Sequence, residues 1–397
     1  VENITDINDK IYVAATKLGV PSDQLAREMT RHYIVDTDRF GLDRPDVEPR
    51  ATDSIPEIVA LIGELVDSGH AYEAGGDVYF AVRSHPAYGE LSGQRPDDLE
   101  AGARVEPGEH KRDPVDFALW KATKPDEDTW WDSPWGRGRP GWHIECSAMA
   151  EKFLGREFAM HGGGRDLIFP HHENEVAQSE CAHAGERFAN FWVHNGFLSV
   201  DSTKMSKSLG NFVTAHEVLK KWPGEVVRLA LLSTHYRDPL DWTEERLRQE
   251  SQRLMRFYIA LNRGKGGLLG APDHAPCEVG AALNDDLNAP LALVRLHELV
   301  PQINLADDQG RFDERDRLQS ALAAGGRLLG ILERDPETYL RGAQAGDEVL
   351  IRDRIQARTE ARQARNFAEA DRLRSELANI GIILEDKPDG TTKWRRA

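Results

Sequence analysis

The 397-residue sequence predicts an α/β protein of several domains, and three patterns along the chain support this prediction. Short apolar runs alternate with glycine turns from Trp142 to about Val200, which is typical of a parallel sheet covered by helices. From residue 213 the pattern is helical and indicates a bundle that ends near residue 341. After a glycine-containing linker, residues 347–397 predict two helices and a hairpin, that is, a small mixed α/β domain.

The first third of the chain predicts the end of a strand followed by helices. Residues 1–5 are prone to form a strand, and apolar side chains then recur at helical spacing over residues 7–18, 22–33 and, most regularly, 54–69. A fold does not normally begin with a bare strand end, so an earlier strand and helix are expected before Val1. These segments belong to a predicted first domain of residues 1–212.

An insertion over about residues 45–140 is predicted within this first domain. Residues 70–82 alternate apolar and polar side chains around Gly75 and Gly76, which is the pattern of a β-hairpin. The segment that follows is rich in proline, glycine and charge and predicts long loops. Its tryptophans are interpreted as packing anchors rather than ligand contacts: Trp120, Trp130, Trp131 and Trp135.

The two later domains are predicted from helix signals. Thr214 and Glu217 form a capping box, and helices are expected at residues 226–232, 243–261, after Asn288, and 318–332. In the last domain we expect helices at residues 347–363 and 366–380, with Asn366 as N-cap and Gly381 as the glycine after the second helix. A hairpin over residues 382–396 then closes the chain.

Composition limits the possible functions. No apolar run approaches the ~20 residues that a membrane span needs, so no membrane partner is expected. The net charge of -17 argues against a protein that coats nucleic acid indiscriminately, but it allows a local basic surface. Three widely spaced cysteines argue for a reducing compartment, and the cytoplasm is the expected location.

Residues 141–175 hold the densest group of metal-ligand side chains in the sequence. His171 and Glu175 are four residues apart and would project from one face of a helix. Cys146 adds a thiolate, and this set of ligands suits Zn2+ better than Mg2+ or Ca2+. The alternative is that His171 caps a helix and Cys146 is a small core residue.

The HGGGRD segment, with Gly163 and Asp166, offers a backbone that a ligand can approach closely. The alternative is an ordinary turn between a strand and a helix. The Asp166 side chain could hold hydroxyls or an amine.

Lys204 and Lys207 lie in the sequence KMSKS, between the α/β segment and the helical bundle. Two ammonium groups in one loop can neutralise the charge that develops on a phosphate in a transition state. The alternative is a solvated lysine loop.

The C-terminal domain is rich in arginine, which predicts contacts with the RNA backbone and stacking of a base on Trp394. A solvated charged helix explains most of these arginines equally well, so only the terminal hairpin and a few arginines are expected to touch RNA. The arginines are Arg352, Arg354, Arg358, Arg362, Arg365, Arg372 and Arg374.

Several of these motifs carry a resemblance to a known family. KMSKS at residues 204–208 resembles the signature loop of class I aminoacyl-tRNA synthetases, and GWHIECSAM with HGGGRDLIFPHHENE resembles cysteinyl-tRNA synthetases. The resemblance runs from NITDINDK at residues 3–10 to TTKWRR at the end of the chain. It implies a Rossmann-type catalytic domain with an inserted subdomain, a stem-contact and helical bundle domain, and an anticodon-binding domain.

The resemblance also implies roles for individual residues. One Zn2+ per chain would be held by Cys146, His171 and Glu175, and the substrate cysteine would lie near Trp142, Thr5 and His171. Lys204 and Lys207 would be catalytic, and ATP, with Mg2+, would contact Lys207, Gly163 and Asp166. In the terminal hairpin, tRNA contacts would come from Trp394, Arg395 and Arg396.

Two departures from the family pattern are visible. The HIGH half-site that holds ATP and a fourth zinc ligand, a cysteine, are expected upstream of Val1, so the chain as given is expected to be inactive without them. Arg165 stands where a serine is expected in HGGGSD.

The implied activity is that of a cysteine–tRNA ligase. Cysteine would bind zinc as its thiolate and be chosen over serine, whose hydroxyl is a harder ligand, and no editing site would be needed. The cysteine carboxylate would attack the α-phosphate of ATP, the two lysines would stabilise pyrophosphate, and the adenylate would pass to tRNA(Cys). A monomer is expected.

Three other hypotheses about the function compete with a cysteine–tRNA ligase. A related ligase joins cysteine to an amino sugar, but it lacks the C-terminal RNA-binding part and the glutamate corresponding to Glu175. A non-catalytic tRNA-binding fragment would explain the missing half-site. A zinc hydrolase would use Glu173 as its base and leaves the lysine loop unexplained.

Overall fold

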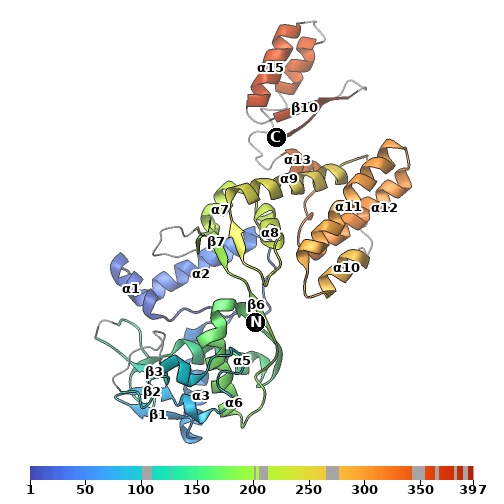
Figure 1. Ribbon diagram of the computed structural model, residues 1–397. Coiled ribbons are helices and arrows are strands. Elements are labelled where there is room, and N and C mark those ends of the chain that lie inside the picture. The colour runs from blue at the N-terminus through green and yellow to red at the C-terminus, as the bar shows by residue number, and fades with distance from the viewer. Residues whose placement is uncertain are drawn as a thin grey trace. The chain divides into compact units, whose positions relative to one another are not determined.

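The computed structural model divides the chain into two compact units (Figure 1). The first unit comprises Val1–Lys221 with Tyr236–Asp241, and the second comprises Trp222–His235 with Trp242–Ala397. The domain boundaries drawn from the sequence stay a prediction. The structure describes residues 1–100, 110–125, 127–200, 203–204, 213–264, 277–341, 354–362, 366–379, 382–387 and 392–396.

The first unit begins with the helices α1 (Asp9–Leu18) and α2 (Ser22–Arg39). The side chain of Asn8 caps α1 by accepting a hydrogen bond from the backbone N–H of Lys10. α2 continues past residue 33, where the sequence predicted its end, because no glycine or proline interrupts the chain before Gly41.

The insertion contains a complete antiparallel sheet rather than mainly long loops. The predicted hairpin forms as β1 (Ala71–Ala74) and β2 (Asp77–Phe80), and β3 (Phe117–Ala122) and β4 (Gly138–Pro140) extend it in the order β1-β2-β3-β4. The sequence analysis missed β3 and β4, because the proline and glycine residues around them are typical of loops.

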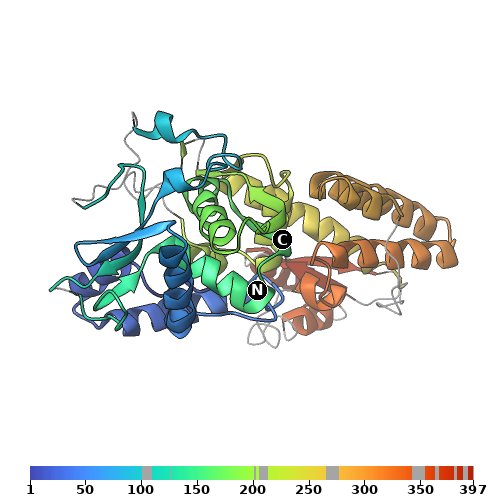
Figure 2. The ribbon, with the colours of Figure 1, turned by 90° about the horizontal axis from the view of Figure 1, so that it is seen from below.

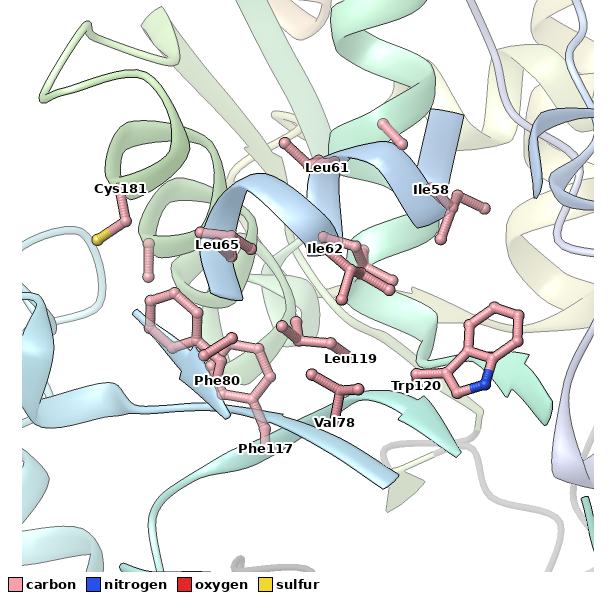
Figure 3. Close-up of a cluster of buried hydrophobic side chains, with 14 of the residues drawn as sticks. Ile58, Leu61, Ile62, Leu65, Val78, Phe80, Phe117, Leu119, Trp120 and Cys181 are labelled. Atoms are coloured by element: carbon pink, nitrogen blue, oxygen red, sulfur yellow. The ribbon is translucent and has the colours of Figure 1, made fainter. Parts of the chain in front are cut away.

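The helix α3 (Ile55–Asp67) covers this sheet and follows the short helix η1 (Ala51–Ser54). Figure 3 shows Ile62 and Leu65 of α3 facing Phe80 and Leu119 of the sheet. The tryptophans divide as follows: Trp120 is fully buried, Trp131 and Trp135 pack against the same core, and Trp130 is exposed. Three of the four are therefore packing anchors, as predicted.

The parallel part of the first unit supplies the predicted α/β pattern. β5 (Phe158–Gly164) pairs in parallel with β6 (Ala189–Asn195), and His161 lies opposite Trp192 in the register. The helix α5 (Trp142–Leu154) precedes β5 and packs on α6 (Glu173–Ala182). Between β5 and α6 the chain makes two short turns, η3 (Arg165–Leu167) and η4 (Ile168–His172).

A second small sheet and a helix follow. Its strand order is β8-β7-β9, with bounds Leu198–Val200 for β7, Thr203–Lys204 for β8 and Leu240–Trp242 for β9. α7 (Ala215–Lys221) begins at the predicted capping box, in which Thr214 and Glu217 exchange hydrogen bonds.

The second unit is helical, as predicted. α11 and α12 lie side by side (Figures 1 and 2), and Asn288 caps α11 by accepting from the backbone N–H of Leu291. The helix predicted at residues 318–332 begins earlier and ends earlier, because Gly330 and Leu332 adopt left-handed backbone conformations. The helices are α8 (Gly224–Leu232), α9 (Glu244–Leu261), α10 (Cys277–Asn284), α11 (Ala289–Asp308), α12 (Phe312–Leu328) and α13 (Pro336–Arg341).

The C-terminal part of the second unit has the predicted helices and hairpin. A helix over residues 354–362 and α15 (Phe367–Asn379) precede the antiparallel pair β10 (Ile382–Asp386) and β11 (Thr392–Arg396). The Asn366 side chain caps α15, whereas Gly381 lies outside the described residues. Every helix in the described ranges is too short or too polar to cross a lipid bilayer.

The packing of α3 on the sheet generates the first prediction. Replacing Ile62, which is fully buried, by alanine removes three carbon atoms from a close-packed core and leaves a cavity. We expect Ile62→Ala to lower the free energy of unfolding by ~2–5 kcal/mol, measured by urea denaturation with tryptophan fluorescence. Val13→Ala on the exposed face of α1 is the control and should change it by less than ~0.5 kcal/mol. Equal losses would contradict this core.

Candidate metal and substrate site

Three side chains with metal-ligand chemistry meet inside the first unit. Cys146 comes from α5, His171 from the turn η4, and Glu175 from the first turn of α6. All three are buried, and one ligand atom from each lies within 4.8 Å of the others. The packing of α5 on α6 therefore brings together the three residues that the sequence analysis selected.

Glu175 is the most deeply buried member of this cluster, and its side-chain partners are imidazoles. Its Oε1 lies 2.7 Å from Nε2 of His171, and its Oε2 lies 3.1 Å from Nε2 of His161. Burial alone would raise the pKa of Glu175, but the hydrogen bonds from His161 and His171 outweigh burial and hold the pKa well below its usual range. Glu175 is therefore an anion inside the protein.

His171 is held on both sides of its ring. Its Nδ1 lies 2.8 Å from Nδ1 of His143, and the Trp142 ring packs against it at a tilt of 30°, with centroids 4.1 Å apart. Burial and the neighbouring His171 lower the pKa of His143 to about 3, so His143 is neutral. Nε2 of His171 faces Glu175, so its N–H can donate to the carboxylate, and a bound metal cation would take the place of that proton.

Cys146 is a thiol that only a cation would ionise. Burial, with the nearby carboxylates of Glu175 and Glu145, raises the pKa of the Cys146 thiol well above its ordinary value. Asn3 donates a hydrogen bond to its Sγ at 3.5 Å. A bound Zn2+ reverses this balance, because a coordinating thiol loses its proton.

The donor set fits zinc. It offers one sulfur, one imidazole nitrogen and one carboxylate oxygen, which are the ligands that Zn2+ prefers, and a buried carboxylate is normally paired or bound to a metal. A second set of candidate ligands shares Glu175 and adds His161 and His172. Nδ1 of His172 lies 2.8 Å from Nε2 of His194, and burial lowers the pKa of His172 to about 3.

Other predicted site residues lie near this cluster. Thr5 is linked to it through Asn3, whose amide nitrogen lies 3.3 Å from the Thr5 hydroxyl. Gly163 lies in β5, where an added Cβ would be 2.8 Å from Cε1 of His172, so only glycine fits beside this ring. Asp166 and Arg165 lie exposed in the turn η3.

The other predicted site residues lie outside the described part of the chain or in the second unit. The backbone of Lys204 lies in β8, while its side chain and the whole of Lys207 lie outside the described residues. Trp394 and Arg395 lie in β11 of the second unit, and the side chain of Arg396 is outside the described part.

Sequence reasoning missed four histidines around the cluster. His143 follows Trp142 in GWHIEC, and His161 opens HGGG. His172 is the second histidine of PHHENE, and His194 is the penultimate residue of β6. Their only signal was repeated histidine in a short stretch, because they come from different elements and have no helical spacing. Asn3 carried no signal at all.

Glu173 does not face the cluster. It is almost fully buried, and its two oxygens accept hydrogen bonds from the backbone N–H groups of Gly89 and Ser92, both at 2.8 Å. A carboxylate held in this way is not placed to act as the base of a zinc hydrolase. The hydrolase hypothesis therefore loses its general base.

Most of the C-terminal arginines that the structure describes are in ion pairs. Arg358 and Arg362 both bind Asp386, with shortest distances of 2.7 and 2.8 Å. Arg354 binds Glu376, and Arg372 binds Glu369 and Glu376. These four arginines therefore have carboxylate partners within their own domain. Arg352 and Arg365 lie outside the described residues.

Trp394 lines a hollow in the second unit. The hollow has a volume of ≈ 830 Å³, and its wall carries both signs of charge. The charged lining residues are Arg263, Arg341, Lys393 and Arg395 with Asp307, Glu337 and Glu385. Trp394 also packs against Leu377, Ile382 and Leu384 of its own domain, so its ring is only partly exposed.

Three family models match the chain. The model "tRNA synthetases class I (C) catalytic domain" matches residues 1–252, and "DALR domain" matches residues 278–333. The model "Cysteinyl-tRNA ligase anticodon binding domain" matches residues 351–395. The predicted class I catalytic domain is thereby confirmed.

Curated relatives match over the whole chain. The cysteine–tRNA ligase of Rhodospirillum rubrum is 51% identical over 401 residues, and the alignment covers 100% of this chain and 86% of the relative. The cysteine–tRNA ligases of Rhodospirillum centenum and Alkalilimnicola ehrlichii are 53% identical over 399 residues and 52% over 411 residues, each with the same coverage.

A solved structure has the same fold. Methionyl-tRNA synthetase of Mycobacterium tuberculosis, in complex with methionyl-adenylate, superposes with a TM-score of 0.55 at 15% identity and covers 81% of this chain and 79% of that chain. At this identity the likeness shows the fold alone, which is the α/β fold of class I synthetases. Together with the matches in sequence, these observations confirm the resemblance: the chain belongs to the cysteine–tRNA ligase family of class I aminoacyl-tRNA synthetases.

Proposed function

We propose that this cysteine–tRNA ligase selects its amino acid with one zinc ion held by Cys146, His171 and Glu175. The observation that carries the proposal is the buried cluster of these three side chains, in which an ionised carboxylate lies between two imidazoles. Zn2+ bound there supplies a soft Lewis acid that prefers the thiolate of cysteine to the hydroxyl of serine. The fourth position belongs to the substrate or to a further protein ligand.

The residues around the cluster orient the ligands. His143 fixes the ring of His171 from behind, and His161 holds the free oxygen of Glu175. Trp142 is 39% exposed and packs against His171, so it can form a wall for a small amino acid bound at the cluster. Thr5 is a further polar contact, linked to Cys146 through Asn3.

ATP activation is assigned to the lysine loop and to the HGGGRD segment. We assign Lys204 and Lys207 to the neutralisation of the phosphates and Gly163 and Asp166 to ATP binding, with Mg2+ accompanying the nucleotide. The KMSKS sequence and the class I catalytic-domain match support this assignment.

Partners follow from the same assignment. ATP, cysteine and tRNA are the substrates, and Trp394, Arg395 and Arg396 are proposed to contact the anticodon of tRNA(Cys). The hollow beside Trp394 and the anticodon-domain match support this role and favour a tRNA ligase over an amino-sugar ligase. A monomer in the cytoplasm remains our expectation, and the buried free thiols of Cys146 and Cys181 suit a reducing compartment.

Replacing the proposed thiolate ligand tests the zinc site. We expect Cys146→Ser to abolish stoichiometric zinc in the purified protein and, in the full-length enzyme, to lower cysteine-dependent ATP–pyrophosphate exchange by about 100-fold, because a hydroxyl is a poor zinc ligand. Metal content is measured by mass spectrometry. Cys181→Ser is a matched control, because Cys181 has the same exposed fraction, 9%, in the same unit. Loss of zinc in both variants would contradict the assignment.

The titration of Cys146 predicts how zinc affinity depends on pH. The raised pKa of the thiol means that it binds a proton at neutral pH, whereas Glu175, with its lowered pKa, is already ionised. Zinc must therefore displace one proton, and its affinity should rise about tenfold per pH unit between pH 7 and 8.5. Competition with a chelator of known affinity measures this slope. A flat profile would mean that the thiol is not a ligand.

The lysine loop can be tested separately from the metal. We expect Lys207→Ala to lower kcat for adenylate formation by about 100-fold, because a cation facing the developing phosphate charge is removed. Zinc content should stay unchanged. Lys220→Ala, an exposed lysine in α7, is the control and should change kcat by less than about twofold. Equal effects of the two variants would exclude a special role for Lys207.

A further inference from the structure

A loop of the insertion, residues 85–92, is hydrogen-bonded to α6 on the side that faces away from the metal cluster. Glu173 accepts hydrogen bonds from the N–H groups of Gly89 and Ser92, both at 2.8 Å, and Asn174 accepts one from the Tyr88 hydroxyl at 2.6 Å. Glu173, Asn174 and Tyr88 are all buried. At ~100° per helical residue, Glu173 lies about 200° around the axis of α6 from Glu175, so the loop and the metal cluster contact opposite faces of the helix.

The turn that carries His171 is irregular, so hydrogen bonds to the neighbouring helix α6 matter for its position. Residues 168–172 form an irregular turn in which Phe169 has extended backbone angles, and α6 becomes regular only at Glu173. His171 therefore lies just before the regular helix, while Glu175 lies one turn further along. The position of the first turn of α6 sets the distance between these two ligands and Cys146.

The turn of the loop that meets Glu173 is sterically restricted at Gly89. Gly89 has a φ of +102°, and an added Cβ would lie 1.8 Å from the carbonyl oxygen of Gln94, so only glycine fits this turn. Two N–H groups of the turn converge on one carboxylate, which makes two charge-assisted hydrogen bonds. Further along α6, Sγ of Cys181 lies 3.4 Å from Nδ1 of His85 (Cys181 is labelled in Figure 3).

We propose that Glu173 is a positioning residue for amino-acid selection. By clamping the loop of residues 85–92 to the back of α6, it fixes His171 and Glu175 at the separation that the zinc ion requires, and it couples the insertion to the metal site. This inference rests on the proposed zinc site. It assigns no contact between Glu173 and the metal or the substrate.

Glu173→Gln tests the clamp without changing volume. The amide offers one accepting oxygen, and its NH2 group would face a backbone N–H, so one buried hydrogen bond is lost. We expect zinc release from the purified full-length protein to 4-(2-pyridylazo)resorcinol to become about tenfold faster, as for other residues behind metal ligands. The KM for cysteine should rise, and the KM for ATP should stay unchanged.

Glu180→Gln is the matched control. Glu180 lies on the same helix, and its Oε1 accepts a hydrogen bond from the backbone N–H of Phe188 at 3.3 Å, far from the ligands. Its zinc release should stay within about twofold of the wild type. Faster release in Glu173→Gln alone, at similar melting temperatures of the two variants, supports positioning rather than a general loss of stability.

Other outcomes separate this inference from the function on which it rests. Zinc release from Glu173→Gln at the wild-type rate would overturn the clamp, and equally fast release from both variants would also overturn it. A wild-type protein without zinc would instead overturn the proposed metal site. If Glu173→Gln does not fold, Tyr88→Phe removes only the hydroxyl bonded to Asn174. Its zinc release should then be about threefold faster, and an unchanged rate would overturn the inference.

Discussion

The buried carboxylate of Glu175 imposes the main constraint on the first unit. A negative charge removed from water costs several kcal/mol unless partners compensate for it, and here the side-chain partners are the imidazoles of His161 and His171. These two histidines come from a strand and from a turn. β5, η4 and α6 must therefore keep their relative positions for the carboxylate to stay ionised, and the same positions place Cys146 within reach.

The parallel pairing of β5 and β6 serves this constraint. It lines up His161 with Trp192 and places His194 at the end of the neighbouring strand, where it meets His172. Gly163 leaves room for the His172 ring. Burial lowers the pKa values of His143 and His172 to about 3, so these two imidazoles add no positive charge that would repel a metal cation.

The sequence predicted what depends on spacing within one element or on a distinctive motif. His171 and Glu175 could be paired because four residues make one helical turn, and Cys146 could be added because its chemistry matches theirs. The pairing of β3 and β4 could not be foreseen, since proline and glycine around them are typical of loops. The histidines of β5 and β6 could not be assigned either. They approach α6 only through strand pairing, which leaves no regular spacing in the sequence.

The insertion shares one hydrophobic core with α5 and α6, the helices that carry Cys146 and Glu175. One continuous apolar cluster contains Ile58 of α3, Val78 and Trp120 of the inserted sheet, Ile144 of α5 and Cys181 of α6. Because most of the buried apolar side chains of the inserted sheet belong to this cluster, a shift of the sheet would disturb the two helices that carry the ligands. Arg139, at the end of the sheet, adds a buried ion pair with Glu127 at 2.9 Å, directly before α5 begins. The buried hydrogen bonds of Glu173 then restrain how the insertion lies on α6, since apolar packing alone tolerates small displacements that hydrogen bonds of fixed geometry do not.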